Sequence, residues 1–398
     1  MDELDALRQM RTTLAREESP DRLTLRTDWR RSAARPRARR TFRVPLVSIA
    51  ATAALAAGTL VAVSLTSDGD QTRTIHGGVS PRMPGNALLV AATNVQKGPT
   101  GTYWHTTRIA GKIYAVGESA AGHYKFESRM QYDDWTDRTG KACSAHQDLP
   151  ARPWTDRDRQ KWVAAGAPKR VRVATEDGPG YLFTESVKRK LTCRSVGDRR
   201  FFGMTPRQLA ELPTQPEQLK DALLDIEGNW EAYAPKVARQ PIRALQGDKR
   251  VRALSDVAGT LLAEAIVPPE VRAAAFRMLA TLPGVKAEGE TTDPLGRSGV
   301  VVSLPLETTI PLGLSTAPRQ LGTYRRQWII DPGKGTLLAV QDLVATPPHG
   351  SRELPSGDDG KPRRLTVADQ PDRFHKPGEV AGYETYEVAE WTDTVPDF

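Results

Sequence analysis

The chain has 398 residues, of which 39% are hydrophobic and 26% are charged, and its formal net charge is +8. This composition is typical of folded domains and excludes a chain that is disordered throughout. Residues 1–43 hold 12 arginines against seven acidic residues, a net charge of +5, so the other 355 residues share only +3. Because the excess charge is confined to one short tail, it does not indicate a nucleic-acid-binding domain, and we expect no nucleic acid as a partner.

The first 20 residues of the tail predict a short amphipathic helix. Leu4, Leu7 and Leu14 fall on one stripe of this helix, and Pro20 ends it. A helix this short is marginal in water alone, so we expect it to fold against a cytoplasmic protein or along a membrane. The arginine-rich stretch that follows favours attraction to anionic lipid, and its basic residues nearest the next segment are Arg35, Arg37, Arg39, Arg40 and Arg43.

Residues 44–65, VPLVSIAATAALAAGTLVAVSL, contain no charged side chain. As a helix these residues span roughly 33 Å, enough for the hydrocarbon core of a bilayer. Arginines precede the segment and Asp68 and Asp70 follow it, so we expect a single-pass anchor in the cell membrane with a cytoplasmic N-terminus. Signal-peptide cleavage at Ala54-Leu55-Ala56 and twin-arginine export through Arg39-Arg40 are the alternatives, but the long tail favours an uncleaved anchor.

The rest of the chain predicts a linker over 66–85 and one extracytoplasmic domain over 86–398. Asn86 is expected to cap a short helix that ends near Val95. The strands expected next cover 102–109, 112–116, 124–135, 170–175 and 181–191.

Cys143 and Cys193 are the only cysteines, and both lie on the predicted extracytoplasmic side. They predict a disulfide that closes a loop of about 50 residues and stabilises the fold by about 3–4 kcal/mol in the chain-entropy model. The alternative is two buried free thiols. Neither cysteine has a second cysteine at ligand spacing, so no metal site is predicted.

From Thr205 the apolar residues follow a helical period, and strands return near Val285. The predicted helices, 206–212, 216–232, 249–266 and 270–282, make up a helical insert over 205–282. The predicted later strands are 285–291, 299–304, 324–331, 336–344 and 382–391, with a mobile loop over 345–377. Strands, then helices, then strands predict an α+β fold with an antiparallel sheet and packed helices.

No motif of catalysis, metal binding or cofactor binding occurs, so we predict a protein that is not an enzyme and has no cofactor. Three acidic residues near Trp135 suggest a calcium or acid–base site, but their spacing favours a solvated turn; they are Asp133, Asp134 and Asp137. His105 lies in an expected strand, which favours a structural role. A basic run from Lys188 to Arg200 suggests contact with phospholipid or an acidic ligand, but an exposed strand face is the commoner explanation.

Three stretches carry a resemblance to a known family: MDELDALRQMR at the start, RRQWIIDPGKGTLLAVQDLV at 325–344 and, most specifically, PPEVRAAAFRMLATLPGVKAEGETTDPLGRSGVVV at 268–302. The chain resembles uncharacterised actinobacterial single-pass membrane-anchored proteins, often encoded beside extracytoplasmic-function sigma factors. The resemblance implies a role in envelope signalling and supplies no catalytic residue. Because the tail contains no His or Cys, it departs from zinc-binding anti-sigma domains, and a sigma-factor contact would use the Leu4, Leu7 and Leu14 helix.

The order of elements also resembles the curved half-barrel of periplasmic lipoprotein carriers. Two functions are therefore expected. The first is a non-enzymatic envelope sensor or regulator linked to a sigma factor. The alternative is a membrane-tethered carrier of a lipid or other hydrophobic ligand, since seven of the eight tryptophans follow the predicted anchor and could line a cavity.

Overall fold

The computed structural model describes residues 87–394 except 176–177, 187–189, 195–200, 229, 231–238, 309–320 and 355–361. The predicted tail, anchor and linker, together with Asn86, lie outside the described residues. Among the helices that the structure describes, none is long and apolar enough to cross a membrane.

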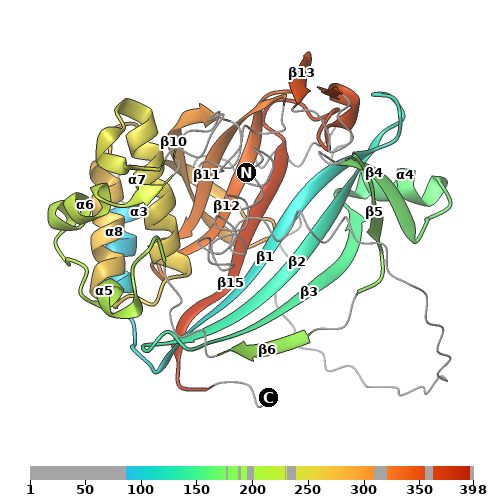
Figure 1. Cartoon of the computed structure of the whole chain (residues 1–398). Helices are drawn as coiled ribbons and strands as arrows, with labels where there is room; N and C mark the ends of the chain where they lie inside the picture. Colours follow the sequence, from blue (N-terminus) through green and yellow to red (C-terminus); the bar gives the residue numbers. More distant parts are fainter. Residues whose placement is uncertain are drawn as a thin grey trace, which may run out of the picture.

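Nine of the described strands form one large antiparallel sheet, which is curved (Figure 1). Its first meander consists of β1 (Tyr103–Val116), β2 (Tyr124–Asp137), β3 (Ala142–Pro153) and β6 (Lys190–Arg194). Its second consists of β9 (Lys286–Thr292), β10 (Ser298–Thr308), β11 (Thr323–Asp331) and β12 (Thr336–Thr346). The C-terminal strand β15 (Val380–Thr392) pairs with both β1 and β12 and so joins the two meanders.

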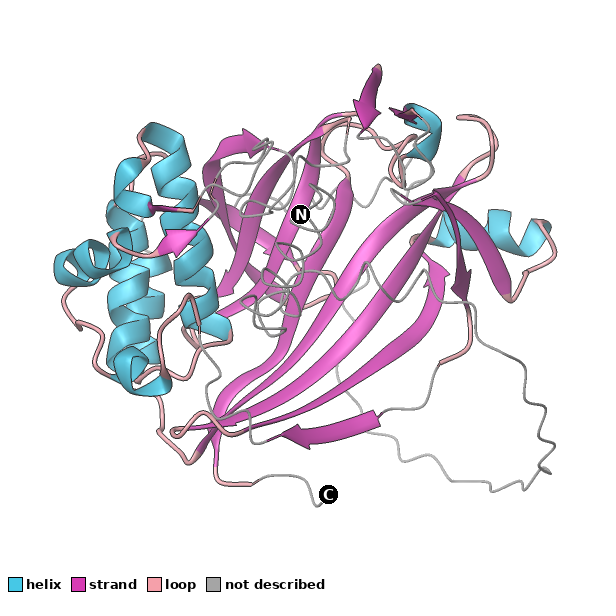
Figure 2. Cartoon of the chain, viewed as in Figure 1, coloured by secondary structure: helices cyan, strands magenta, loops and turns pink. Residues whose placement is uncertain are grey.

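The chain crosses from one edge of the sheet, β6, to the other edge, β9, through a group of packed helices at one end of the sheet (Figure 2). These helices are α5 (Pro206–Ala210), α6 (Pro216–Leu224), α7 (Gly247–Ala263) and α8 (Pro269–Thr281), with η1 (Ile242–Ala244) and the short pair β7 (Glu227–Gly228) and β8 (Gln240–Pro241) between α6 and α7. The N-terminal helix α3 (Ala87–Val95) packs on α8. We call these five helices the helical layer.

The helical layer packs on one face of the sheet through α7, and we call this the inner face. Trp328 of β11 is fully buried there, so close to α7 that a β-carbon at Gly259 would lie 3.1 Å from its ring. Trp104 of β1 donates a hydrogen bond from its indole nitrogen to the Ala263 carbonyl at 3.0 Å. In α8, Phe276, Met278 and Leu279 are completely buried. This main core explains why α7 and α8 are rich in apolar residues.

A second, smaller core lies at the opposite end of the inner face. There the hairpin of β4 (Arg170–Thr175) and β5 (Gly178–Phe183), together with α4 (Asp156–Ala164), covers the sheet. Its buried residues are Tyr114, Val116, Tyr124, Phe126, Ala151, Val171, Val173 and Leu182. The inner face is therefore covered by apolar packing at both ends, with a stretch of sheet between them.

Two turns from the family-like stretches hold elements together. In the β9–β10 turn, the carboxylate of Asp293 accepts from Arg297, whose guanidinium also donates to the carbonyls of Tyr386 on β15 and Leu338 on β12 at 2.7 and 2.9 Å. In the β11–β12 turn, the Pro332 carbonyl accepts from Asn94 of α3. The strand pairing shows that each turn joins the two strands of a hairpin.

Several elements differ from the sequence prediction. The strands expected over 102–109 and 112–116 are one strand, β1, and the strand expected over 181–191 divides into β5 and β6. The helix expected over 216–232 ends at Leu224. The sequence did not predict β3 or α4.

The segment 345–377, predicted as a mobile loop, contains ordered structure in its described residues. It holds β13 (Ser351–Leu354), β14 (Arg363–Thr366) and η2 (Val367–Asp369). Beyond them, the Pro371 carbonyl accepts from the Ala115 amide of β1, Arg373 donates to the Gly117 carbonyl, and Asp372 accepts from Tyr324. This segment continues alongside β1 where the pairing with β15 has stopped, so it belongs to the fold.

The same segment buries His375, which gives stability a defined pH dependence. Burial, reinforced by the positive charges of Lys125 and His123, lowers the pKa of His375 to about 3. In the unfolded chain the imidazole of His375 takes up a proton near pH 6.5, whereas in the folded chain it stays neutral until the pH approaches 3. The contribution of neutral His375 to the free energy of unfolding is therefore complete above pH 6.5 and is lost as the pH falls towards 3. Between pH 7 and pH 5 we expect a loss of about 2 kcal/mol in the free energy of unfolding. Urea titrations at each pH measure this loss. The variant His375→Gln should make the free energy of unfolding depend less on pH, whereas His146→Gln, at an exposed position, should leave the dependence unchanged.

Candidate functional site

A network of buried charges joins α7 to the inner face of the sheet. Asp256 of α7 lies between Arg252, one turn earlier, and Arg326 of β11, at 3.3 and 3.2 Å. Arg326 also forms two parallel hydrogen bonds, of 2.8 and 2.9 Å, with Asp342 on β12. Burial disfavours the charged form of Arg326, but the carboxylates of Asp342 and Asp256 outweigh burial and raise the pKa of Arg326. At Arg252 burial dominates and lowers the pKa to about 10.

The network continues towards the centre of the sheet through Arg108 of β1. Its guanidinium contacts Glu384 of β15 at 2.9 Å and lies 4.4 Å from the ring centre of Tyr132. Burial opposes the charge on Arg108, but Glu384 and Glu264 outweigh it and raise its pKa. The Tyr386 hydroxyl lies 3.2 Å from Glu264 and 3.4 Å from Glu384, and burial together with these carboxylates raises the pKa of Tyr386.

Beyond Arg108, the middle of the inner face is polar and only partly covered. Strand alternation and register place side chains of β1, β2, β3 and β15 there, between the helical layer and the β4–β5 hairpin. We call these residues the polar band: Arg108, Lys112, Tyr132, Asp134, His146, Asp148 and Glu384. His146 is exposed, and the Glu384 side chain is 37% exposed. The band is therefore a candidate surface for a polar ligand or for another protein.

The carboxylates of this region converge as they do in some enzymes, but their partners favour a structural reading. Asp342 and Asp256 are held by arginines, and Glu264 accepts from Tyr386. Among the described residues, no group of three or more His, Cys, Asp or Glu side chains is placed to hold a metal ion. These ion pairs and hydrogen bonds therefore anchor α7 on the sheet.

On the outer face, a second buried cluster surrounds Glu127 of β2. This completely buried carboxylate accepts from Arg152 at 2.6 Å and from the Tyr383 hydroxyl at 2.5 Å, and Arg129 lies 3.5 Å away. The Tyr383 ring lies over Gly111, where a β-carbon would come within 2.2 Å of it. Burial, with the negative charge of Glu127, raises the pKa of Tyr383. The cluster fixes the outer face and leaves no open cleft around Glu127.

Two of the three acidic residues expected in a solvated turn lie elsewhere. Asp133 and Asp134 are part of β2 and point to opposite faces, so they form no joint site. Asp133 is buried and accepts from Thr107 at 2.7 Å, and Asp134 accepts from Ser144. Only Asp137 lies at the β2–β3 turn, where it accepts from the amides of residues 139 and 141. The turn prediction was therefore wrong for the first two residues.

His105 lies beside Asp133 on the outer face. Its ring stacks on Trp135, with ring centres 4.4 Å apart, and its Nε2 lies 3.3 Å from the Thr107 hydroxyl. That hydroxyl donates to Asp133, so it does not donate to the histidine as a nucleophile would. The arrangement supports the structural role predicted for His105.

The tryptophans are distributed over separate packing regions. Trp104, Trp230 and Trp328 belong to the main core, Trp162 packs on the hairpin core, and Trp154 lies on the outer face. The buried guanidinium of Arg272 lies over the indole of Trp104, 3.4 Å from a ring centre. These placements favour ordinary packing over a shared ligand cavity.

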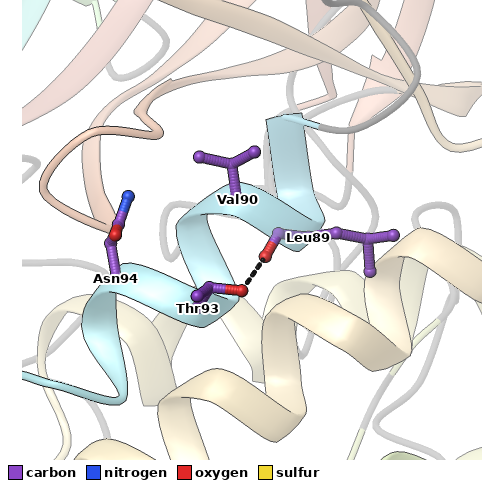
Figure 3. A pocket seen from close by; sticks show the side chains of 4 residues that line it. All are labelled: Leu89, Val90, Thr93 and Asn94. Atoms are coloured by element: carbon purple, nitrogen blue, oxygen red, sulfur yellow. Dashed lines mark hydrogen bonds between the residues drawn. The ribbon is translucent and has the colours of Figure 1, made fainter.

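A shallow, open pocket of about 310 Å³ lies on α3, lined by Leu89, Val90, Thr93 and Asn94 (Figure 3). The Thr93 hydroxyl donates to the Leu89 carbonyl at 3.0 Å, and the Asn94 amide donates to Pro332. The polar groups of this pocket therefore already bond within the protein, so the pocket offers little for ligand recognition.

Of the predicted site residues, only the cysteines lie within the described part of the chain. Cys143 is disulfide-bonded, and the register of β3 and β6 places it opposite Cys193, in agreement with the predicted pair. The membrane-flanking arginines and the Leu4, Leu7 and Leu14 helix lie outside the described residues. The sequence missed the polar band, because its residues meet only through strand pairing.

Comparisons with protein-family models, with curated proteins and with solved structures find no match to this chain.

Proposed function

We propose that this chain is a non-enzymatic envelope protein, tethered to the cell membrane by residues 44–65, whose outer domain binds a polar ligand or a protein on the polar band. Its tail meets an extracytoplasmic-function sigma factor in the cytoplasm. The observation that carries the proposal is the composition of the band: charged and hydrogen-bonding side chains line the sheet between two apolar ends. Such a surface suits recognition, because its polar groups give orientation and specificity.

The carrier of a hydrophobic ligand is the weaker alternative. The curved antiparallel sheet with helices at one end supports the analogy with lipoprotein carriers. A lipid cavity, however, needs apolar walls, and the partly covered stretch of the inner face carries Arg108, Lys112 and Glu384. The band therefore favours a polar partner.

The tail contact is tested by co-purification of the full chain, in detergent, with an extracytoplasmic-function sigma factor of the same organism. The triple variant Leu4→Asp, Leu7→Asp and Leu14→Asp removes the apolar stripe and should lose the sigma factor. Gln9→Asp, on the opposite side of the predicted helix, is the control and should retain it. Equal recovery with the wild type and the triple variant would remove the sigma-factor contact from the proposal.

The polar band is tested by measuring transcription from sigma-dependent promoters in cells that express the full chain. Lys112→Glu changes the charge of the band at a partly exposed position, without touching the tail. If the band senses a ligand, transcription should change by about fivefold or more while co-purification persists. Unchanged transcription, with the chain at normal abundance, would argue against sensing by the band.

A further inference from the structure

We propose that the outer surface of the β4–β5 hairpin docks on an anionic lipid bilayer. The surface consists of Arg170, Arg172, Tyr181 and Phe183, which we call the hairpin patch. The proposal rests on the proposed tether, because it assigns the membrane that the tether reaches as the partner.

The alternation of the two strands creates the patch. Val171, Val173 and Leu182 are buried in the hairpin core, so the residues between them face away from the sheet. In the register, Arg172 lies opposite Tyr181 and Arg170 lies opposite Phe183, so each arginine is beside an aromatic ring.

The patch holds two of the four large hydrophobic side chains that are exposed within the described residues. Phe183 is 57% exposed and Tyr181 is 40% exposed, although most large apolar side chains in the described part of the chain are buried. Val163 of α4, which is 58% exposed, comes from the element just before the hairpin. Three of the four large hydrophobic side chains that are exposed within the described residues therefore come from residues 163–183, at the end of the sheet away from the helical layer (Figure 1).

The residue types favour the interface of a bilayer over other partners. Aromatic rings settle at the level of the lipid headgroups, with their apolar surface towards the acyl chains. An arginine guanidinium can donate two parallel hydrogen bonds to the oxygens of one phosphate group, and it keeps its positive charge there. The Arg170 guanidinium lies 3.5 Å from the centre of the Tyr181 ring, so the cation and the ring present one combined surface.

The two arginines give the hairpin patch itself a positive charge, which is complementary to anionic lipid. The patch itself contains no carboxylate, and the neighbouring ion pair of Lys169 with Glu185 is neutral. In the sequence, Glu176 and Asp177 lie between the two strands of the hairpin, and residues 187–200 after it hold six basic residues and one acid. Each basic residue near an anionic surface contributes about 1 kcal/mol to its attraction.

The length of the chain before α3 allows the contact. Residues 66–86 span at most about 75 Å when fully extended. The 14 residues of β1, which run from the helical layer towards the hairpin, cover roughly 46 Å. A bilayer that holds residues 44–65 is therefore within reach of the patch, and the tether raises its effective concentration there.

The test uses the full chain in vesicles of phosphatidylcholine with or without phosphatidylglycerol, and a photo-crosslinking residue, p-benzoylphenylalanine, at position 183. Mass spectrometry of the irradiated chain identifies lipid adducts. The same residue at position 387, an exposed site on β15, is the control. We expect at least about fivefold more adduct at position 183 than at 387 in anionic vesicles, and a similar loss in vesicles of phosphatidylcholine alone.

Charge reversal in the patch supplies the second arm. Arg170→Glu with Arg172→Glu should lower the lipid adduct at position 183 about fivefold or more, with thermal unfolding unchanged, because both side chains are exposed. Adducts at 183 no more frequent than at 387, or adducts to a second copy of the chain, would overturn the docking. Flotation of the chain with the vesicles is measured separately. A chain that does not float has no tether, and this result would overturn the proposed function and the docking together. A chain that floats without lipid adducts would overturn only the docking.

Discussion

Replacement of Gly335 by alanine is expected to lower the free energy of unfolding by about 3 kcal/mol or more. Gly335 closes the β11–β12 turn with φ of +69°, a conformation that side chains disfavour. It also touches α3: an added β-carbon would lie 2.5 Å from the Ala91 carbonyl oxygen and 2.6 Å from the Val95 amide nitrogen. Because both atoms belong to backbone, no side-chain rotation relieves the contact.

Gly350 is a matched control for this change. It has the same φ of +69°, but nothing lies within 4 Å of an added β-carbon. Gly350→Ala should therefore cost only the conformational strain, about 1 kcal/mol. Urea unfolding of the full chain, followed by tryptophan fluorescence, compares the two. Equal losses would contradict the docking of α3 on the turn.

The α3 contact matters because α3 is the first described element after the predicted anchor and linker. It is held by α8, by the Asn94 hydrogen bond to Pro332 and by its contact with Gly335. A force or displacement from the tether would therefore reach the helical layer and the second meander together. In the proposed sensor, this connection links the tail to the sheet that carries the polar band.

The sequence predicted those elements whose residues alone determine their form. Helices α7 and α8 bury 12 of 17 and 9 of 13 residues and contain many alanines and leucines, which favour a helix. The strands on both sides of the Asp331 turn were also predicted, and in that turn the Asp331 carboxylate accepts from the Lys334 amide. Strand β3, ACSAHQDLPARP, contains few β-branched residues and two prolines, and becomes a strand through its pairing with β2 and β6.

The candidate site could not be predicted from the sequence, because its residues come from distant segments. Arg326 meets Asp342 only in the register of β11 and β12, and Arg108 meets Glu384 only because β15 returns beside β1. One signal was present: Arg326 and Asp342 are charged residues inside otherwise apolar strands, where a charge needs a partner. Helix α4 also had a signal, the Thr155–Asp158 capping box.

Replacement of Asp256 by alanine is expected to lower the free energy of unfolding by about 3–5 kcal/mol, because it leaves buried charge without compensation. The Arg252 side chain is only 1% exposed, and its pKa of about 10 already reflects the cost of burial. Asp221→Ala is the control, because Asp221 pairs with Arg243 at 3.0 Å but is 72% exposed, and such pairs contribute about 0.5 kcal/mol.

A double variant separates charge balance from packing in this region. Arg252→Met with Asp256→Leu removes both charges and keeps similar volume, so it should recover at least about half of the stability lost in Asp256→Ala. Urea unfolding at pH 7 measures all four proteins, including the wild type. If Asp256→Ala costs no more than Asp221→Ala, the network does not hold α7 on the sheet. If the double variant is as unstable as the single one, the loss comes from packing and not from the unpaired arginine.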